Sequence, residues 1–357
     1  MDNVIIGSGV FGLATAIELI EQGSNVTVID SNNKNIASRN ALGRLDPIFK
    51  GSGSPNDIEN NDSIQRPHDQ KSLALRSFNT HNEYYKKFYK GTDFEYEFLS
   101  IPTLQILNNE DLNELKEDVD QISSLGFSLE ILESNDEILN IQKGISSNIN
   151  KAALIHGTKF INARNFLFSL EERFKSLGGN IINGKAENID LLQKKLIINE
   201  DDKIKFDNLV ICTGPWINDL LSKINAEVEV FPAKGEIIKV KCDDIKLNFH
   251  LHGECSIVER NDNLIWIAAT HEKNVFNSKK TVQAEEELIK KASKIIPGIL
   301  NCTVIDHSAC VRPSTENGMP IVKEALEDSG IYVASGGGGW GIMQCFYIGK
   351  LIKDMVS

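Results

Sequence analysis

The sequence predicts an α/β fold, and three segments support this prediction. Residues 4–30 have the pattern of an apolar strand, a glycine-rich loop, an amphipathic helix and a second strand ending in an acid. Residues 206–221 have the pattern of an apolar strand that leads through Thr213 and Gly214 into a short helix. Residues 330–349 begin as a strand, continue with four consecutive glycines and end as a helix. With 357 residues, the chain can bury a large core and form two domains, which can be interleaved.

The first of these segments has the order of elements that a dinucleotide site needs. Gly7 allows the tight turn after the first strand, Gly9 lets the backbone approach a pyrophosphate, and Gly12 lets the helix pack closely on the sheet. The helix N-terminus then faces the phosphates. Asp30 ends the second strand, where a carboxylate can accept both hydroxyls of an adenosine ribose. No cation for a 2′-phosphate follows this acid, which argues against NADP.

Composition limits the classes of partner. The formal net charge is −12 and no long Lys/Arg block occurs, so we do not expect nucleic acid or an anionic membrane as the primary partner. No apolar run approaches membrane-spanning length, and the first strand leaves no room for a signal peptide, so we expect a cytoplasmic protein. The six cysteines form no CxxC pair, and we therefore expect reduced, mostly buried thiols and no zinc site.

Periodicity predicts the remaining elements. Residues 72–89, 111–125 and 284–296 are expected to be helices, and residues 98–107 a strand with a proline at its edge. Residues 50–70 combine Gly, Ser, Pro, Asn and Asp with few apolar residues, which is typical of a mobile surface excursion. A lid is the alternative for this segment.

Several segments, in the same order along nearly the whole chain, resemble the D-amino-acid oxidase superfamily. After the N-terminal fingerprint, residues 37–47 (ASRNALGRLDP) resemble its second flavin-contacting loop, and residues 206–218 resemble its strand before a Gly-x-Trp turn. Further resemblances are to the start of the substrate-domain sheet (231–235), its hairpin (257–270), its Arg-Pro segment (311–321) and the glycine loop over the flavin ring (335–342). The chain is most similar to the glycine oxidase, sarcosine oxidase and D-amino-acid dehydrogenase branch.

This resemblance implies a Rossmann-like FAD-binding domain interleaved with an α+β substrate domain built on an antiparallel sheet. The expected FAD-binding domain comprises residues 1–80, 150–225 and 308–357, and the substrate domain comprises residues 81–149 and 226–307. The implied reaction oxidises the C–N bond of a small amino or imino acid, such as glycine, sarcosine or a D-amino acid. Hydride passes to the flavin N5, the imine hydrolyses, and O2 or another acceptor takes the electrons. The resemblance implies no dedicated general base, and a homo-oligomer is compatible with it.

The resemblance also implies the site residues. Arg312 is expected to hold the substrate carboxylate with its planar guanidinium, a structural arginine at a strand end being the alternative. Arg44 is expected to face the flavin ring, with a surface salt bridge as the alternative. Ser256 stands where the family often has a substrate-binding tyrosine, and His252 is expected to line the substrate cavity. The residues expected to contact FAD are Gly7, Gly9, Val10, Phe11, Gly12, Asp30, Ser31, Asn40, Gly43, Arg44, Ala186, Thr213, Gly214, Trp216, Arg312, Gly337, Gly338, Gly339, Trp340, Gly341 and Ile342.

Departures from the family pattern leave the branch open. Gly337 and Gly339 stand where glycine oxidases have His and Arg, and Trp340 stands where Asn is usual. Trp266 stands near the place of the lysine that activates oxygen in sarcosine oxidases, so a dehydrogenase is an alternative to an oxidase. Cys310 lies about where sarcosine-oxidase relatives attach flavin. We expect non-covalent FAD, with a covalent link through this cysteine as the alternative.

Other functions and a metal site are weaker hypotheses. His250, His252 and Glu254 share one face of a strand, but we expect them to line the substrate cavity rather than to bind a metal. One alternative function is the flavin subunit of a heteromeric amine dehydrogenase. Another is a tRNA wobble-uridine modifying oxidoreductase, whose loop resembles residues 40–47, although the net acidity of the chain counts against it.

Overall fold

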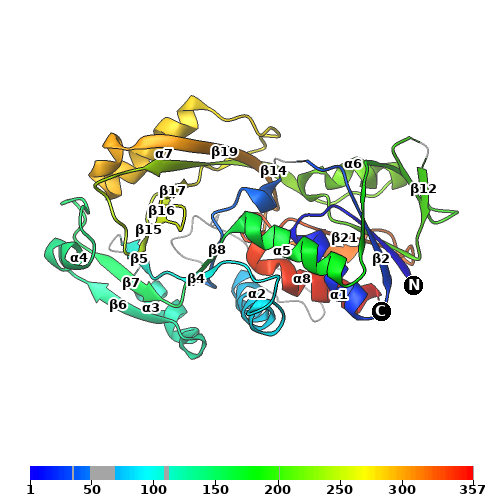
Figure 1. Cartoon of the computed structure of the whole chain (residues 1–357), viewed down its shortest axis with the longest axis horizontal. Helices are drawn as coiled ribbons and strands as arrows, with labels where there is room; N and C mark the ends of the chain where they lie inside the picture. Colours follow the sequence, from blue (N-terminus) through cyan, green and yellow to red (C-terminus); the bar gives the residue numbers. More distant parts are fainter. Residues whose placement is uncertain (34–35, 49–68, 108–111, 201, 357) are drawn as a thin grey trace.

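Two large sheets organise the protein in a computed structural model that describes residues 1–33, 36–48, 69–107, 112–200 and 202–356 (Figure 1). The six-stranded sheet has the order β20-β21-β13-β1-β2-β9. Neighbouring strands in it are parallel, except that β20 is antiparallel to β21. Its strands are β1 (Asp2–Ile6), β2 (Asn25–Asp30), β9 (Asn180–Asn183), β13 (Asn208–Ile211), β20 (Ile321–Glu324) and β21 (Ile331–Ser335).

Both faces of this sheet are buried, because alternate residues of its strands pack into cores on opposite sides. Ile5 belongs to a core formed with α1 (Val10–Glu21), α2 (Gln70–Tyr84), α5 (Ala163–Ser176) and α8 (Gly341–Val356). Val4 and Ile6 point to the opposite face, as the two-residue period of a strand requires. There they join a second core with α6 (Ile217–Leu221) and a small sheet of β10 (Ala186–Asp190), β11 (Lys195–Ile198) and β12 (Asp202–Lys205). Burial on both faces explains the continuous apolar runs of β1 and β13.

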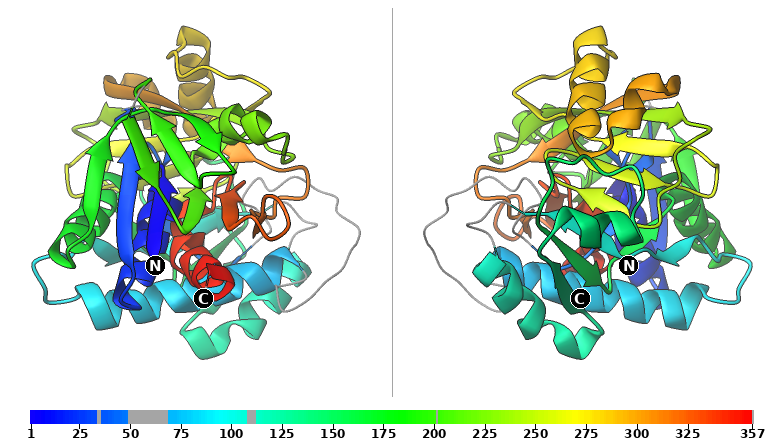
Figure 2. Two further views of the ribbon diagram at one scale, coloured as in Figure 1. Left: turned by 90° about the vertical axis from the view of Figure 1, so that its right-hand side faces the viewer. Right: turned by 90° about the vertical axis from the view of Figure 1, so that its left-hand side faces the viewer.

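The nine-stranded sheet has the order β18-β14-β17-β16-β15-β5-β7-β6, with β19 paired to β14. It is antiparallel except where β15 runs parallel to β5. Helix α7 (Val282–Ile295), gold in Figure 2, packs against it and lies far from the red helix α8. The strands are β5 (Thr103–Ile106), β6 (Ser128–Leu132), β7 (Ala152–His156), β14 (Phe231–Lys241), β15 (His250–His252), β16 (Ser256–Glu259), β17 (Ile265–Ala268), β18 (Glu272–Lys273) and β19 (Thr303–Ser314).

Smaller elements complete the chain. The strands β3 (Arg44–Leu45), β4 (Phe98–Ser100) and β8 (Lys159–Ile161) form a three-stranded sheet. Helices α3 (Leu112–Gln121) and α4 (Asn135–Ile141) flank β6 along the sequence. Within the described residues, no helix is long and apolar enough to cross a membrane.

The α/β fold class is confirmed, and the predicted elements differ in detail. The helix predicted at 72–89 begins at Gln70, because Asp69 caps it: the Oδ1 atom of Asp69 accepts a 2.6 Å hydrogen bond from the Ser72 amide. After Tyr84 the helix continues as a π-helical turn. The strand predicted at 98–107 is two strands, β4 and β5, separated by Ile101 and Pro102. The helix predicted at 284–296 is α7, and that at 111–125 is α3 followed by a 3-10 turn. Residues 50–68 of the predicted excursion, and residue 111, lie outside the described residues.

The predicted domain boundaries agree with the six-stranded sheet but divide the nine-stranded sheet. Every strand of the six-stranded sheet falls within 1–80, 150–225 or 308–357. Strand β7, however, pairs with β5 and β6 in the nine-stranded sheet although residues 150–225 were assigned to the FAD-binding domain. Strand β19 crosses the boundary at 307/308 because it pairs with β14 along its whole length. The division stays a prediction.

The expectation that all six cysteines are reduced was wrong. Cys242 and Cys302 form a disulfide with a Cα–Cα distance of 4.8 Å, while Cys212, Cys255, Cys310 and Cys345 are free and buried. The pairing follows from the fold: β14 and β19 are antiparallel, with Lys241 opposite Thr303, and the two cysteines are the next residues outward. Sixty residues separate them in sequence, so spacing alone gave no sign of the bond.

Candidate active site

A cavity of about 690 Å³ lies between the two large sheets, lined by residues of β1 and β2 on one side and of β14 and β17 on the other. The structure brings together Arg44, His252, Ser256 and Arg312, the residues expected to act on the substrate. Every residue expected to contact FAD also lines the cavity, with the exception of Gly12. Strands β14 and β19 run side by side from the α7 end of the molecule toward this region (Figure 1).

The three glycines of the first loop have different roles. Gly7 has a φ of +104°, and a Cβ on it would lie 2.5 Å from the carbonyl oxygen of Cys212. A Cβ on Gly12 would lie 1.8 Å from the carbonyl oxygen of Gly7, so this glycine permits the contact of α1 with β1 and faces away from the cavity. Gly9 lines the cavity, and the atom nearest to a Cβ added there would be Ser38 Oγ at 3.3 Å. Only the space beside Gly9 is therefore left open toward a ligand.

Asp30 and Ser38 hold the backbone at the start of α1 by accepting hydrogen bonds from its amides. The Asp30 Oδ2 atom accepts a 2.7 Å hydrogen bond from the amide of Ser8, and its Oδ1 accepts one of 2.6 Å from the amide of Asn32. Ser38 Oγ accepts a 3.2 Å hydrogen bond from the amide of Val10 at the start of α1. Sequence reasoning missed Ser38, since a serine in a loop carries no signal that it will contact a helix 28 residues away.

The consecutive glycines at 336–339 join the two sheets. Gly338 donates a 2.8 Å hydrogen bond from its amide to the carbonyl of Pro313 at the end of β19. A Cβ on Gly337 would lie 2.8 Å from Cζ of Phe11, so the loop packs directly on α1. Ser335 Oγ donates a 2.9 Å hydrogen bond to the carbonyl of Gly214, which ties this loop to the one after β13. A side chain at Gly336 or Gly337 would prevent this close approach, because its Cβ would lie 2.7 Å from Cγ2 of Thr315 or 2.8 Å from Cζ of Phe11.

Arg312 lies partly buried on the cavity-facing side of β19. Its Nη1 atom donates a 3.3 Å hydrogen bond to the carbonyl of Thr270. The guanidinium lies over Gly235 of β14, where a Cβ would come within 2.0 Å of Nη2. Among the ion pairs of the described residues, none involves Arg312. The cavity therefore contains a guanidinium whose charge no described carboxylate neutralises.

Arg44 lines the cavity from β3 and has an acidic partner. Its Nε donates a 2.6 Å hydrogen bond to Oδ2 of Asp46, and the side chains are 13% and 0% exposed. The alternative for Arg44 was a surface salt bridge. Arg44 does form a salt bridge, but the pair is buried and lies at the cavity wall. A buried ion pair of this kind fixes the direction of the guanidinium.

A histidine pair lies near Arg44. His252 Nδ1 is 2.9 Å from Ser256 Oγ, and both side chains line the cavity. His250 lies behind it, with ring centroids 5.5 Å apart, and its Nδ1 is 3.0 Å from Thr103 Oγ1. Burial, and then the charges of Arg44 and His252, hold the pKa of His250 well below its usual range. Glu254 lines the cavity like His252 and binds Lys294 at 2.6 Å, whereas His250 does not line it. The described residues contain no group of three or more His, Cys, Asp or Glu placed to hold a metal.

Three further residues change the sequence-based interpretation. Trp266 does not line the cavity: it lies on β17 two residues before Ala268, which does, and its Nε1 donates a hydrogen bond to Oδ2 of Asp262 at 3.1 Å. Cys310 does line it, and burial raises the pKa of its thiol although the Arg312 charge opposes this. His271, which sequence reasoning missed, is exposed at the cavity, and burial followed by the charges of Arg312 and Lys273 lowers its pKa.

Comparison with known proteins shows the family. A family model described as FAD dependent oxidoreductase (DAO) matches residues 2–355. The chain belongs to this family. It is an FAD-dependent oxidoreductase, and its resemblance to D-amino-acid oxidases is thereby confirmed. The cavity fits the FAD of this DAO-family chain, because Gly9 is open toward it, the N-terminus of α1 and Asp30 line or adjoin it, and its length reaches from Asp30 to Arg312.

Some relatives of this DAO-family chain cover nearly its whole length. Glycine oxidase of Bacillus subtilis (strain 168) is 25% identical over 366 residues, which is 99% of this chain and 92% of the relative. The crystal structure of glycine oxidase from Geobacillus kaustophilus superposes with a TM-score of 0.85 at 21% identity, over 99% of this chain and 94% of that one. Iminodiacetate oxidase from Chelativorans sp. BNC1 gives a TM-score of 0.85 at 18% identity, over 99% and 95%. These structures show the same fold.

Proposed function

We propose that this enzyme oxidises the C–N bond of a small amino or imino acid whose carboxylate binds Arg312. The observation that carries the proposal is the guanidinium of Arg312, which lines the cavity over Gly235 and has no carboxylate partner among the described residues. A planar guanidinium binds a carboxylate with two parallel hydrogen bonds, which fixes the position of the substrate α-carbon. The similarity to proteins named glycine oxidase and iminodiacetate oxidase supports the same class of substrate.

The residues of the chain supply binding and orientation. Bound FAD would supply the hydride acceptor for the carbon beside the amine, and water would hydrolyse the resulting imine. The residues proposed to hold FAD are Gly7, Gly9 and Gly12 of the first glycine loop, Asp30, residues 40–44 and residues 337–341, and all of these line the cavity except Gly12. The His252 and Ser256 pair offers hydrogen-bonding groups to the substrate. The lowered pKa of His271 keeps that imidazole neutral at pH 7, so it does not compete with Arg312 for an anion.

The test is an anaerobic visible spectrum of the FAD-loaded enzyme before and after glycine, sarcosine, proline or a D-amino acid. We expect one of these substrates to bleach the flavin band. The Arg312→Met variant should retain FAD yet need at least about 100-fold more substrate, because a bidentate charged contact is lost. An amine without a carboxylate should respond equally in both proteins. A flavin band that no amino acid bleaches would contradict the proposal and favour a flavin subunit that needs a partner.

The electron acceptor, the FAD linkage and the location belong to the same proposal. Bleached enzyme that reoxidises rapidly in air with formation of peroxide would be an oxidase, and one that needs a dye would be a dehydrogenase. We propose non-covalent FAD, because the raised pKa of Cys310 keeps its thiol protonated and unreactive; acid precipitation should then release all of the flavin. We retain the cytoplasm as the proposed location, to be checked by cell fractionation, although disulfides such as Cys242–Cys302 are commoner in oxidising compartments.

A further inference from the structure

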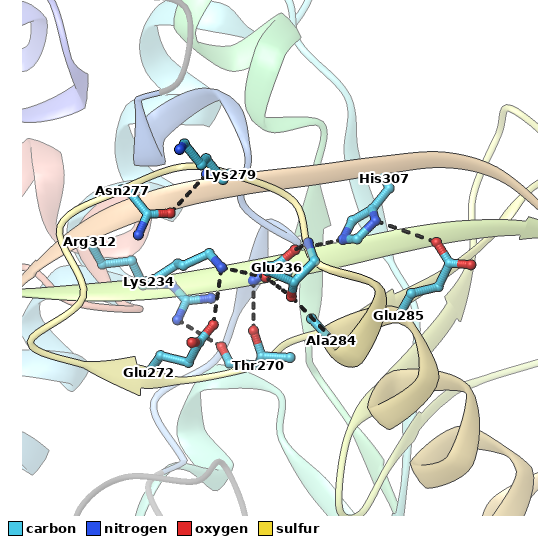
Figure 3. Close-up of polar contacts among 11 residues, drawn as sticks. Lys234, Glu236, Thr270, Glu272, Asn277, Lys279, Ala284, Glu285, His307 and Arg312 are labelled. Carbon is cyan, nitrogen blue, oxygen red and sulfur yellow. Dashed lines mark hydrogen bonds and ion pairs between the residues drawn. The ribbon is translucent and has the colours of Figure 1, made fainter.

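Arg312 is oriented by a neutral group. The acceptor of its 3.3 Å hydrogen bond is the main-chain carbonyl of Thr270, and Figure 3 shows the guanidinium directed at this atom. Thr270 is 3% exposed and lines the cavity just after β17. A carboxylate in this place would also orient the guanidinium, but it would neutralise the charge that attracts an anionic ligand. A carbonyl orients the side chain and leaves its charge available.

The peptide of Thr270 is itself held at two points by Glu236 of β14. The amide of Glu236 donates a 3.0 Å hydrogen bond to Oγ1 of Thr270, and the amide of Thr270 donates one of 3.2 Å to the carbonyl of Glu236. The side chain and the main chain of Thr270 are thus both engaged by one residue of the neighbouring strand. This pair of contacts sets the direction of the carbonyl that Arg312 binds.

Glu236 in turn has a fixed, fully buried carboxylate. It accepts hydrogen bonds from the amide and hydroxyl of Thr281, at 2.9 and 2.8 Å, and lies 2.7 Å from Lys234 Nζ and 2.8 Å from His307 Nε2 (Figure 3). Burial alone would raise the pKa of Glu236, but the hydrogen bonds of Lys234 and Thr281 and the Lys234 charge outweigh it and lower the pKa. The carboxylate is therefore ionised and anchored on several sides, with Thr281 also capping α7.

We propose that Thr270, held by Glu236, is a positioning residue that presets Arg312 for the carboxylate of the substrate. The inference rests on the proposed function, in which Arg312 binds that carboxylate. Its specific content is that the Thr270 hydroxyl, which points away from Arg312 toward Glu236, controls ligand affinity by fixing the Thr270 carbonyl.

The experiment compares Thr270→Val, Thr270→Ser and wild type as FAD-loaded enzymes. Valine matches the shape of threonine but cannot accept the Glu236 hydrogen bond, whereas serine retains the acceptor. Acetate is titrated while the flavin spectrum is followed, which reports carboxylate binding without turnover, and kcat and KM are measured separately. We expect Thr270→Val to weaken acetate binding and raise KM by about threefold to tenfold, the effect of one lost hydrogen bond, with a smaller change in kcat. Thr270→Ser should restore wild-type affinity.

A matched control separates this role from a general loss of stability. Thr80→Val removes a buried hydroxyl that bonds the Arg76 carbonyl in α2, away from the cavity, and should leave acetate affinity unchanged. Equal acetate affinity in Thr270→Val and wild type would overturn the inference while leaving the proposed function standing. Equal losses in Thr270→Val and Thr270→Ser would also overturn it. A wild-type enzyme whose flavin is bleached by none of the amino acids would overturn the proposed function, and the inference with it.

Discussion

Gly235 and Arg312 share one space in the sheet: a Cβ on Gly235 would lie 2.0 Å from Nη2 and 2.2 Å from Cζ of Arg312. The two residues come from paired antiparallel strands, in which Gly235 stands opposite Cys310 and Arg312 stands opposite Ala233. The arginine therefore leans diagonally along the ribbon and covers the glycine. Glycine at this position is required by the side chain of a neighbour, since the position itself is in ordinary extended backbone.

The first prediction follows from this contact. Gly235→Ala should displace the guanidinium and raise KM for an amino acid substrate by roughly tenfold or more, while FAD content stays at the wild-type level. Gly298→Ala is the matched control, since its Cβ would meet only the side chain of Ile245, with the flexible Cδ1 at 3.0 Å, outside the cavity. Steady-state kinetics with flavin quantification measure both. An unchanged KM in Gly235→Ala would show that Arg312 does not depend on this space.

The second prediction separates folding from cofactor binding within one loop. Gly12→Ala should destabilise the protein, because its Cβ would lie 1.8 Å from the Gly7 carbonyl oxygen. Gly9→Ala should fold with a nearly normal melting temperature as apoprotein, since only Ser38 Oγ is within 3.3 Å, yet bind FAD much more weakly. Thermal unfolding of the apoproteins and FAD titration distinguish the two effects. Equal FAD affinity in Gly9→Ala and wild type would place the pyrophosphate elsewhere.

The third prediction concerns acid stability. His81 in α2 is buried, with Nε2 3.1 Å from the Tyr96 hydroxyl, and burial lowers its pKa to about 3, although backbone hydrogen bonds at Ile342 and Met343 oppose this. The unfolded chain binds this proton near pH 6.5, so between pH 6.5 and about 3 the unfolded state holds more protons and stability falls as pH falls. The expected slope is up to about 1.4 kcal/mol per pH unit from this group.

Denaturant unfolding between pH 7 and pH 4 tests the predicted effect of His81 on acid stability. His81→Gln should flatten the pH dependence of the unfolding free energy, even if it is less stable at pH 7 through loss of the Tyr96 contact. His156→Gln, at an exposed position, should keep the wild-type slope. Parallel curves for wild type and His81→Gln would contradict the assignment.

The fourth prediction concerns the disulfide. Replacing both Cys242 and Cys302 with serine should lower the unfolding free energy by about 4 kcal/mol in the chain-entropy estimate for a loop of this length. Reductant should lower the melting temperature of wild type and leave that of the double variant unchanged. Thiol titration of the unreduced, unfolded protein should find the four free cysteines, whereas six would show that the bond is absent.

Local patterns explain which parts of the fold the sequence could predict. The β1-α1-β2 unit was predictable because the glycines, the apolar period and Asp30 all lie within 27 residues and act on one another directly. The strand at 98–107 was predicted too long, because its apolar residues continue across Pro102 although the proline ends the pairing.

Contacts between distant segments explain what was missed at the site. Asp46 beside Arg44, Thr270 beside Arg312 and Ser38 beside Val10 are ordinary polar residues whose partners are set by strand register and loop approach. The resemblance to known flavoproteins supplied the cavity-lining residues, but it carried no information on the polar residues that hold them in place. Trp266 was expected near the place of the oxygen-activating lysine of sarcosine oxidases, but it lies on β17 two residues before the cavity-lining Ala268 and does not line the cavity itself.

The order of segments around the cavity also has a consequence for synthesis. The residues that line it come from the beginning of the chain, the middle and the glycine loop at 336–341, and α8 packs on α1. A polypeptide still on the ribosome would hold β1, α1 and β2 long before β21, the glycine loop and α8 have emerged. The cofactor therefore meets a complete site only after residues 331–356 are free to fold, so flavin uptake must follow translation of that segment.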